Sequence, residues 1–240
     1  MDHGIVIPPF GYIPSPEDTR DYKVDALYGL VGKPKPVAAA LPSWFVVKYL
    51  NPVSNQGNTP MCVAYSLAGV KQWQDRADQT PTRWWDFSEP VFFKAIGGGP
   101  NGAVLRNGLN YLRKTGYPLV INQPVAPPNT GMIGGYYSVP ASRYDLCAAI
   151  STFGPLVCGF DWPDSWSHPA IPKIGSPVAP RPSGQVNGHA IEAIGWNTVG
   201  LLLQNTWGIW PAPGKHGRIV IPWAYVASNM REAWKLKDAA

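Results

Sequence analysis

The sequence has few of the residues that crosslink a chain or bind a metal. Its three cysteines cannot all pair with one another and include no CxxC motif, and its four histidines lack the spacing of zinc ligands. We therefore expect no disulfide framework, no metal ion and no cofactor, although one bond between Cys147 and Cys158 is left open. The histidines at positions 3, 168 and 216 are expected to lie on the surface or in loops.

Strong charge of one sign and long apolar runs are also lacking. The formal net charge of +5 comes from 20 basic and 15 acidic residues, and the basic ones form no long run. This argues against a nucleic-acid partner. No stretch approaches the roughly 18 apolar residues of a membrane span, and the first residues do not form a signal peptide. We expect a soluble protein, cytoplasmic or associated with a phage particle, that binds neither nucleic acid nor membrane.

The residues that are abundant predict a large core and many loops. Apolar residues make up 45% of 240 positions, with 11 Trp and 11 Tyr, and 27 Pro and 25 Gly lie between the apolar stretches. Residues 1–40 are rich in Pro and Gly and predict an extended arm or short leader on the surface of the main body. The sequence leaves open whether this arm plugs a cleft or only packs against the body.

Helical periodicity dominates the first half of the chain and short apolar runs the second. Helices are predicted from Pro60 to Asp75, over residues 103–116 and over 143–154. In the first of these, Val63, Leu67, Val70 and Trp73 recur near helical spacing. Strands are predicted at 156–160, 189–196, 201–207 and 217–223. The pattern indicates an α+β fold, with one domain over 41–240 and lobes at about 41–135 and 136–240.

Cys62 is the first candidate for chemistry, in "NQGNTPMCVAYS", where a loop passes into the first helix. Unpaired N–H groups at a helix start favour a thiolate and lower its pKa. Taken alone, a cysteine in an apolar run is more often a buried structural thiol. His189, in "GQVNGHAIEAIGW", supplies the possible imidazole partner. Asn205, in "LLLQNTWGIW", falls near the end of the next predicted strand, where pairing could place its amide beside the ring.

An ordered series of segments resembles the papain-like cysteine proteases. It includes "LPSWFVV", "VSNQG", "QGNTPMCVAYS", "FSEPVFF", "GGGPNGAVLRNGLNYLRKTGYPL", "LCAAISTFGPLVCGFDW" and the His and Asn-x-Trp-Gly segments, and covers about residues 41–222. Cys, His and Asn come in the family's order and near its spacing. The resemblance implies a helical N-terminal lobe, an antiparallel barrel-like C-terminal lobe and an active site in the cleft between them.

The same resemblance implies the roles of four residues in the reaction. Cys62 corresponds to the nucleophile, His189 to the general base and acid, and Asn205 to the group that orients the imidazole. Gln56 corresponds to the side-chain donor to the oxyanion. No metal takes part in this chemistry.

It also implies four residues near the substrate. Gly102 and Ala103 stand where the family's backbone pairs with an extended peptide, and Asp161 stands where an acidic residue often approaches the catalytic His. Trp207 corresponds to the residue that shields the His and Asn pair from water. The expected partner is a peptide or protein substrate.

The chain also departs from the family's pattern around the nucleophile. Pro60, Met61 and Val63 replace the usual Gly-Ser and Trp, and Ala103 in place of Gly is expected to narrow the groove. Three hypotheses follow: a cysteine peptidase, a catalytically silent papain-fold module that binds a peptide or serves a larger assembly, and a peptidase for the stem peptides of peptidoglycan. The third is suggested by the positive charge and by an arm that resembles the leader of bacterial and phage relatives.

Overall fold

The computed structural model describes residues 10–78, 86–120, 129–167, 178–210 and 217–239. His3, His168 and His216 lie outside these ranges, as does the stretch 168–177 between the predicted strands at 156–160 and 189–196. The helices are α1 (Val24–Leu30), α2 (Cys62–Asp78), α3 (Glu89–Ala95), α4 (Leu105–Lys114), α5 (Arg143–Phe153) and α6 (Trp223–Asn229), with short 3-10 turns at Ala38–Ala40 and Asp164–Trp166. The strands are β1 (Tyr12–Ile13), β2 (Phe45–Val46), β3 (Ala103–Val104), β4 (Ile133–Ser138), β5 (Leu156–Pro163), β6 (Val186–Trp196), β7 (Gly200–Gln204), β8 (Arg218–Pro222) and β9 (Met230–Asp238).

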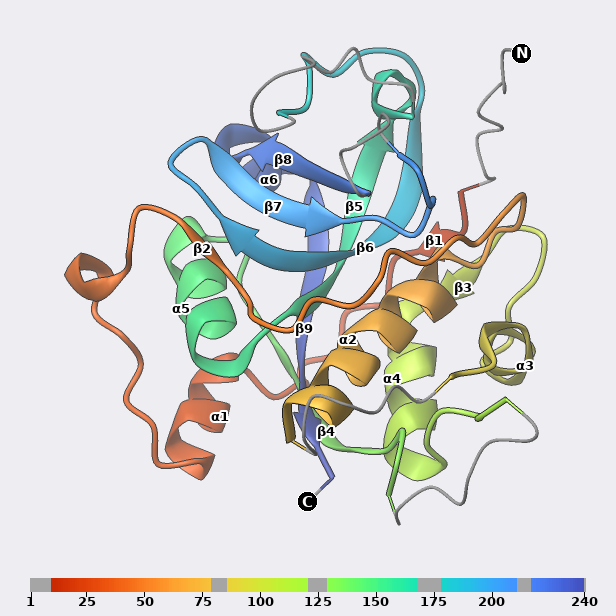
Figure 1. Cartoon of the computed structure of the whole chain (residues 1–240), viewed down its shortest axis with the longest axis horizontal. Coiled ribbons are helices and arrows are strands. Elements are labelled where there is room, and N and C mark those ends of the chain that lie inside the picture. The colour runs from red at the N-terminus through yellow and green to blue at the C-terminus, as the bar shows by residue number, and fades with distance from the viewer. Residues whose placement is uncertain (1–9, 79–85, 121–128, 168–177, 211–216, 240) are drawn as a thin grey trace.

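Helix α2 runs through the middle of the molecule and lies against β6 (Figure 1). Val63, Leu67 and Val70 are fully buried, as their helical spacing predicts, while Trp73 is half-buried. The close approach to the sheet depends on Gly69, because a Cβ there would lie 2.0 Å from Oε1 of Glu192 on β6. The predicted helix is confirmed, and it carries Cys62 as its first residue.

Helices α4 and α5 confirm the other two helical predictions. Leu105, Leu109 and Leu112 form the buried face of α4, and Gly116, with φ of +85°, follows its end. Gly154, with φ of +90°, ends α5. A glycine at this place allows the left-handed conformation that lets the chain leave a helix.

An antiparallel sheet fills the second half of the molecule. Its strand order is β4-β9-β5-β6-β7-β8, and β2 also pairs with β6. The four strands predicted from the sequence are β5 to β8, although β6 begins three residues earlier than expected. The sheet curls strongly (Figure 1), and among the described residues its end strands β4 and β8 do not pair with each other. The C-terminal lobe is thus barrel-like but not closed.

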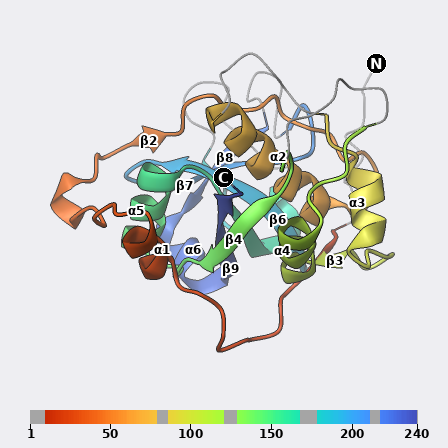
Figure 2. The same cartoon turned by 90° about the horizontal axis from the view of Figure 1, so that it is seen from below.

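The N-terminal arm is more structured than its composition indicates. It contains α1, where Val24, Leu27 and Tyr28 share one face and are buried against the core. Earlier in the arm, β1 pairs in parallel with β3, which directly precedes α4. Figure 2 shows the arm passing around the outside of the body between these two points. The sequence predicts an extended arm, and the arm is instead helical at α1, because three apolar residues at helical spacing have a core to pack on.

Two hydrophobic clusters form the core. One joins α1 and α5 to the sheet, and the other joins α2, α3 and α4 to β9 and to Tyr12 of the arm.

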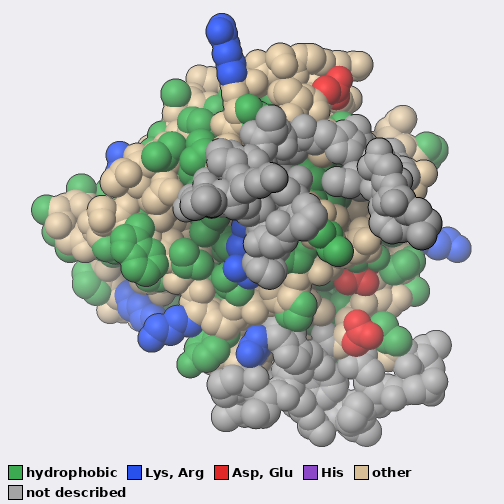
Figure 3. All heavy atoms as spheres, turned by 45° about the horizontal axis from the view of Figure 1, so that its top comes forward, with side chains coloured by type: hydrophobic (Ala, Val, Ile, Leu, Met, Phe, Trp, Pro, Cys, Tyr) green, Lys and Arg blue, Asp and Glu red, His purple; other side chains and the backbone are tan. Residues whose placement is uncertain are grey.

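All three cysteines are buried free thiols, so Cys147 and Cys158 do not form the bond that the sequence left open. In the described part of the chain, no helix is both long enough and apolar enough to cross a membrane. On the face in Figure 3, charged side chains stand singly or in small groups among apolar ones.

Candidate active site

His189 and Asn205 form a buried pair at neighbouring strands of the sheet. His189 lies on β6 and Asn205 directly follows β7, which pairs with β6. Nε2 of His189 lies 2.8 Å from Oδ1 of Asn205, and this oxygen also accepts the N–H of Thr206 at 2.8 Å. Because Oδ1 is an acceptor, Nε2 carries the proton in the neutral ring. Nδ1 then has a free lone pair, and it has no hydrogen-bond partner among the described residues.

Aromatic rings enclose this pair. The ring of Trp207 lies 4.7 Å from that of His189, and the ring of Trp162 lies 5.0 Å from it on another side. Trp207 thus lies directly against the ring of His189. Trp162 was not predicted, because its place beside the ring depends on the sheet register. Phe160 lies opposite His189, and residue 162 shares the face of residue 160.

Cys62 lies beside the residue that follows His189. Its Sγ accepts the backbone N–H of Ala190 at 3.5 Å, and its side chain is fully buried. The backbone N–H groups of Gly11 and Val63 also reach the sulfur and favour its thiolate form. One of these donors comes from α2 itself, as expected at a helix start, and another comes from the arm.

Gln56 connects the loop before α2 to the loop after β7. Its Oε1 accepts the hydroxyl of Thr206 at 2.6 Å, and its backbone N–H donates to the Thr206 carbonyl at 2.8 Å. Its Nε2 donates to the carbonyl of Thr59 at 2.7 Å, which leaves the second hydrogen of this amide available. Thr206, which the sequence did not single out, thus couples the predicted oxyanion donor to the Asn205 loop.

The arm occupies the surface over these groups. The ring of Phe10 lies 6.0 Å from that of His189 and 5.9 Å from that of Trp207. The next residue, Gly11, is packed so closely that a Cβ would lie 1.9 Å from the carbonyl oxygen of Pro60. The arm therefore lies against His189, Trp207 and the loop before α2.

Gly102 and Ala103 pair with this arm. The Ala103 N–H donates to the Gly11 carbonyl at 2.9 Å, and a Cβ on Gly102 would lie 1.9 Å from the same oxygen. Gly102 also has φ of +96°, so this position requires glycine on two grounds. The backbone edge that the resemblance assigns to an extended peptide is thus filled by the chain's own segment.

Asp161 does not approach His189 as the resemblance implied. Its register partner on β6 is Gly188, so its side chain leaves the opposite face of the strand from Trp162. The carboxylate pairs with Arg231, and the Asp161 carbonyl accepts the hydroxyl of Tyr225 at 2.7 Å.

Burial favours the neutral forms of Cys62 and His189 in this structure. It raises the pKa of the Cys62 thiol to about 11, against the smaller opposite effect of the N–H donors. It lowers the pKa of His189 to about 4, against the opposing hydrogen bond to Asn205. The expected lowering of the Cys62 pKa is therefore wrong for this arrangement, because desolvation by burial outweighs the N–H donors at the helix start.

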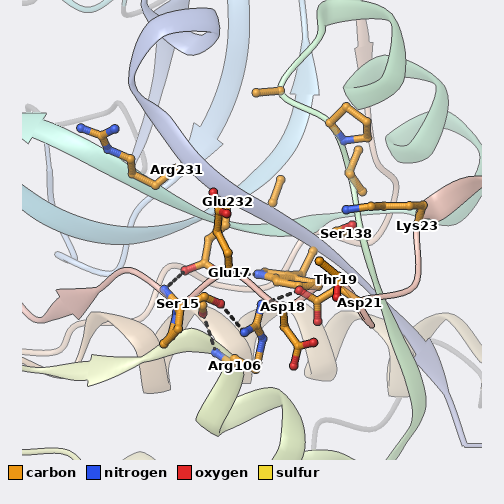
Figure 4. Close-up of a pocket in the computed structure, with 16 residues that line it drawn as sticks. Ser15, Glu17, Asp18, Thr19, Asp21, Lys23, Arg106, Ser138, Arg231 and Glu232 are labelled. Carbon is orange, nitrogen blue, oxygen red and sulfur yellow. Dashed lines mark hydrogen bonds and ion pairs between the residues drawn. The ribbon is translucent and has the colours of Figure 1, made fainter.

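No cluster of three or more His, Cys, Asp or Glu residues that could hold a metal ion exists in the described ranges. A cavity of about 490 Å³ lies beside the cleft, between arm residues 15–23 and the strands β4 and β9. Its walls carry Arg106, Arg231 and Glu232, together with the charged side chains of the arm (Figure 4).

The fold has relatives among solved structures. Xylellain, a cysteine protease from Xylella fastidiosa, is 21% identical with a TM-score of 0.77, and the match covers 98% of this chain and 97% of that one. ProCathepsin B S9 from Trypanosoma congolense is 16% identical with a TM-score of 0.64, over 83% and 78% of the two chains. The Carica candamarcensis cysteine protease CMS1MS2, solved in complex with E-64, is 17% identical with a TM-score of 0.62, over 83% and 100%.

No family model and no curated protein matches the sequence. The structural likeness nevertheless spans nearly the whole of this chain in its comparison with xylellain. Together with the strand order and the position of α2 against β6, it establishes the architecture. The chain has the fold of the papain-like cysteine proteases.

Proposed function

We propose that the protein is a cysteine peptidase that hydrolyses peptide bonds through a covalent acyl-enzyme intermediate. The observation that carries the proposal is the state of the His189 ring. Oδ1 of Asn205 accepts a hydrogen bond from Nε2 of His189 at 2.8 Å, while Nδ1 of the ring has no hydrogen-bond partner among the described residues. The adjacent residue, Ala190, donates to the Cys62 sulfur at 3.5 Å. A nucleophile, a base and a group that orients the base are the minimum set for this chemistry.

In the proposed reaction, Nδ1 of His189 takes the thiol proton of Cys62. The thiolate then attacks the peptide carbonyl carbon, and the carbonyl oxygen becomes an oxyanion that the second hydrogen of Gln56 Nε2 stabilises. Collapse of this intermediate breaks the C–N bond, and the imidazolium gives its proton to the leaving amine. Water, deprotonated by the same ring, then hydrolyses the thioester and restores the thiol.

The arm must leave the cleft before this reaction can begin. With Phe10 against His189 and Gly11 against the sulfur, no space remains for a substrate carbonyl. Removing the arm would also rehydrate the two reacting groups. The desolvation that now keeps Cys62 and His189 neutral would weaken, and a thiolate–imidazolium pair would become accessible.

The first test is peptide hydrolysis by an opened variant, defined as the full-length chain with Phe10→Gly and Tyr12→Gly. It removes the side chains over the cleft and keeps α1 in place. We expect cleavage of casein under reducing conditions, abolished by Cys62→Ala and retained by the control Cys147→Ser, which alters another buried thiol. Circular dichroism confirms that each variant is folded. Activity that survives Cys62→Ala would refute the proposal.

Two alternatives are separated in the same assay. A silent papain-fold module, favoured by the complete burial of Cys62, would leave casein and peptides uncleaved even in the opened variant. A specialised cell-wall peptidase, whether bacterial or phage-associated, would release stem-peptide fragments from purified peptidoglycan and leave casein intact. Mass spectrometry of the soluble products distinguishes these outcomes.

A further inference from the structure

Another cavity lies near the end of α2 that is far from Cys62. Its volume is about 460 Å³, and its lining includes residues of α1, α5 and β2, which lie on one side of the molecule (Figure 1). Trp73 and Ala77 of α2 form one wall, and Lys235 on β9 belongs to another. Trp73 is roughly 16 Å from Cys62 along the helix axis, at about 1.5 Å per residue. The cavity is therefore separate from the site of the candidate catalytic residues.

The aromatic side chains that line this cavity keep part of their surface exposed. Four of them are half-buried or exposed: Phe45, Tyr49, Trp73 and Phe153. Nε1 of Trp73 donates to the Lys48 carbonyl at 2.7 Å, and the ring of Phe153 packs at 4.6 Å from that of Tyr28. These contacts hold the walls in place without an occupant. A preformed cavity of this size with apolar walls is typical of small-molecule sites, and an apolar ligand would cover the exposed rings.

Tyr49 lines the cavity in an unfavourable backbone conformation. Its φ is +58°, and among the described non-glycine residues only Asn129 also has a positive φ. Asparagine tolerates the left-handed region, whereas a bulky residue there is a true outlier. The ring is 49% exposed, with the Arg76 guanidinium 5.9 Å away, so burial does not offset this cost. Strained residues of this kind cluster at sites that bind ligands.

The charged side chains around the cavity are mostly positive. They are Lys33, Lys48, Lys235, Lys237 and Asp238. Asp238 is the only carboxylate among the described lining residues, and it pairs with Lys71, which is not part of the lining. Lys235 is 3% exposed, and its Nζ donates to the Pro155 carbonyl at 3.3 Å and lies 5.5 Å from the Trp73 ring. A buried ammonium beside apolar walls favours an anionic group in the same cavity.

We propose that this cavity binds a small apolar carboxylate, an alkyl or aryl chain that ends in one anionic group. The carboxylate pairs with the ammonium group of Lys235, and the apolar part covers the rings of Trp73, Phe153 and Tyr49. The exposed Lys33 and Lys48 add to the positive potential around the site. The inference does not depend on the proposed peptidase function, because the cavity shares no lining residue with the candidate catalytic groups.

The test is isothermal titration calorimetry of the full-length chain with octanoate, 1-octanol and octylammonium, which share one alkyl chain and differ in charge. We expect octanoate to bind about tenfold more tightly than octanol, and octylammonium to bind more weakly than octanol. Lys235→Met keeps an unbranched side chain and removes the ammonium, so octanoate should then bind no more tightly than octanol. Lys114→Met, at an exposed position on α4, is the control and should leave the order unchanged.

Tyr49→Gly tests the same site without destabilising the fold. Glycine suits the positive φ, so the free energy of unfolding in urea should not fall. Octanoate and octanol should both bind about fivefold more weakly, because the variant removes apolar surface that either ligand would cover. Unchanged affinities in Tyr49→Gly would overturn the inference. So would wild-type protein that binds none of the three ligands, or that binds octanoate no more tightly than octanol.

Discussion

At the scale of single residues, the site depends on which ring nitrogen of His189 is held by a hydrogen bond. Asn205 Oδ1 accepts from both Nε2 and the Thr206 amide, so the ring is fixed in one tautomer and Nδ1 is left to exchange a proton. The order of Cys, His and Asn in the sequence indicated these residues. It could not indicate Trp162 or Thr206, whose contributions depend on sheet register and on a contact between two distant loops.

Asn205→Ala should lower kcat by about tenfold or more with a smaller change in KM. The imidazole would lose the acceptor that fixes its orientation, and general acid–base catalysis contributes about 10²- to 10⁴-fold in such sites. Steady-state kinetics of the opened variant measure the effect, with exposed Asn110→Ala as the control. An unchanged kcat would mean that Asn205 does not position the ring.

Glu192 should make stability fall as the pH rises. It is buried against Gly69, and burial raises its pKa to about 8, against a smaller opposite effect of Arg218. The folded state therefore binds a proton more tightly than the unfolded state, whose carboxyl titrates at about 4.3. The resulting stabilisation is complete below that pH and is lost as the pH rises through 8.

Urea denaturation at pH 5 and pH 8 checks this behaviour. Glu192→Gln keeps the shape and removes the titration, so its free energy of unfolding should fall less between the two pH values than that of the wild type. Equal changes in the two proteins would show that Glu192 is charged in the folded state throughout this range.

At the scale of elements, the arm is the feature that most changes the chemistry. Its strand β1 runs parallel to β3, and Gly11 presents an N–H to the Cys62 sulfur. Burial, to which the arm contributes, favours the protonated form of the Cys62 thiol.

Gly11→Ala should loosen the arm and raise peptidase activity in the full-length chain. The added Cβ would lie 1.9 Å from the carbonyl oxygen of Pro60, so the segment must move out of the cleft. Gly29→Ala is the matched control, because a Cβ there has no atom within 4 Å and lies on α1, away from the site. Rates that are equal in the two variants and the wild type would exclude inhibition by the arm.

The contrast between α2 and the arm explains how far prediction from sequence could go. Val63, Leu67 and Val70 repeat at helical spacing, so the spacing of apolar residues along the sequence is enough to predict α2 and its buried face. The path of the arm depends on tertiary contacts of Phe10 and Tyr12 with residues more than 170 positions away. Local periodicity carries no information on such contacts. The direction of the Cys62 pKa could not be predicted for the same reason.

At the scale of the whole molecule, one buried cation ties the central helix to the end of the sheet. Lys71 on α2 is fully buried, and its Nζ contacts Asp75 at 2.5 Å and also pairs with Asp238 on β9. Burial raises the pKa of Asp75 to about 6, although Lys71 acts in the opposite direction. Both carboxylates pair with this single ammonium group, Asp75 in a buried position and Asp238 in a partly exposed one.

Lys71→Met should lower the free energy of unfolding by about 3–5 kcal/mol at neutral pH, because it removes one partner of a buried ion pair and leaves carboxylates uncompensated. The loss should be smaller at pH 5, where Asp75 is largely protonated. Chemical denaturation measures both values, and exposed Lys114→Met serves as the control. If Lys71→Met lowers the free energy of unfolding by less than about 1 kcal/mol, the cluster contributes no more than an exposed ion pair, which would contradict the prediction.

The rate of Cys62 alkylation by iodoacetamide against pH tests most directly whether Cys62 is an activated nucleophile. It is measured by mass spectrometry in the opened variant and in the same variant with His189→Ala. We expect fast alkylation that persists well below pH 8 with His189 present and is lost without it, because the imidazole stabilises the thiolate. A slow rate that rises only near the ordinary thiol pKa of about 8.5, alike in both proteins, would contradict an activated nucleophile at this site.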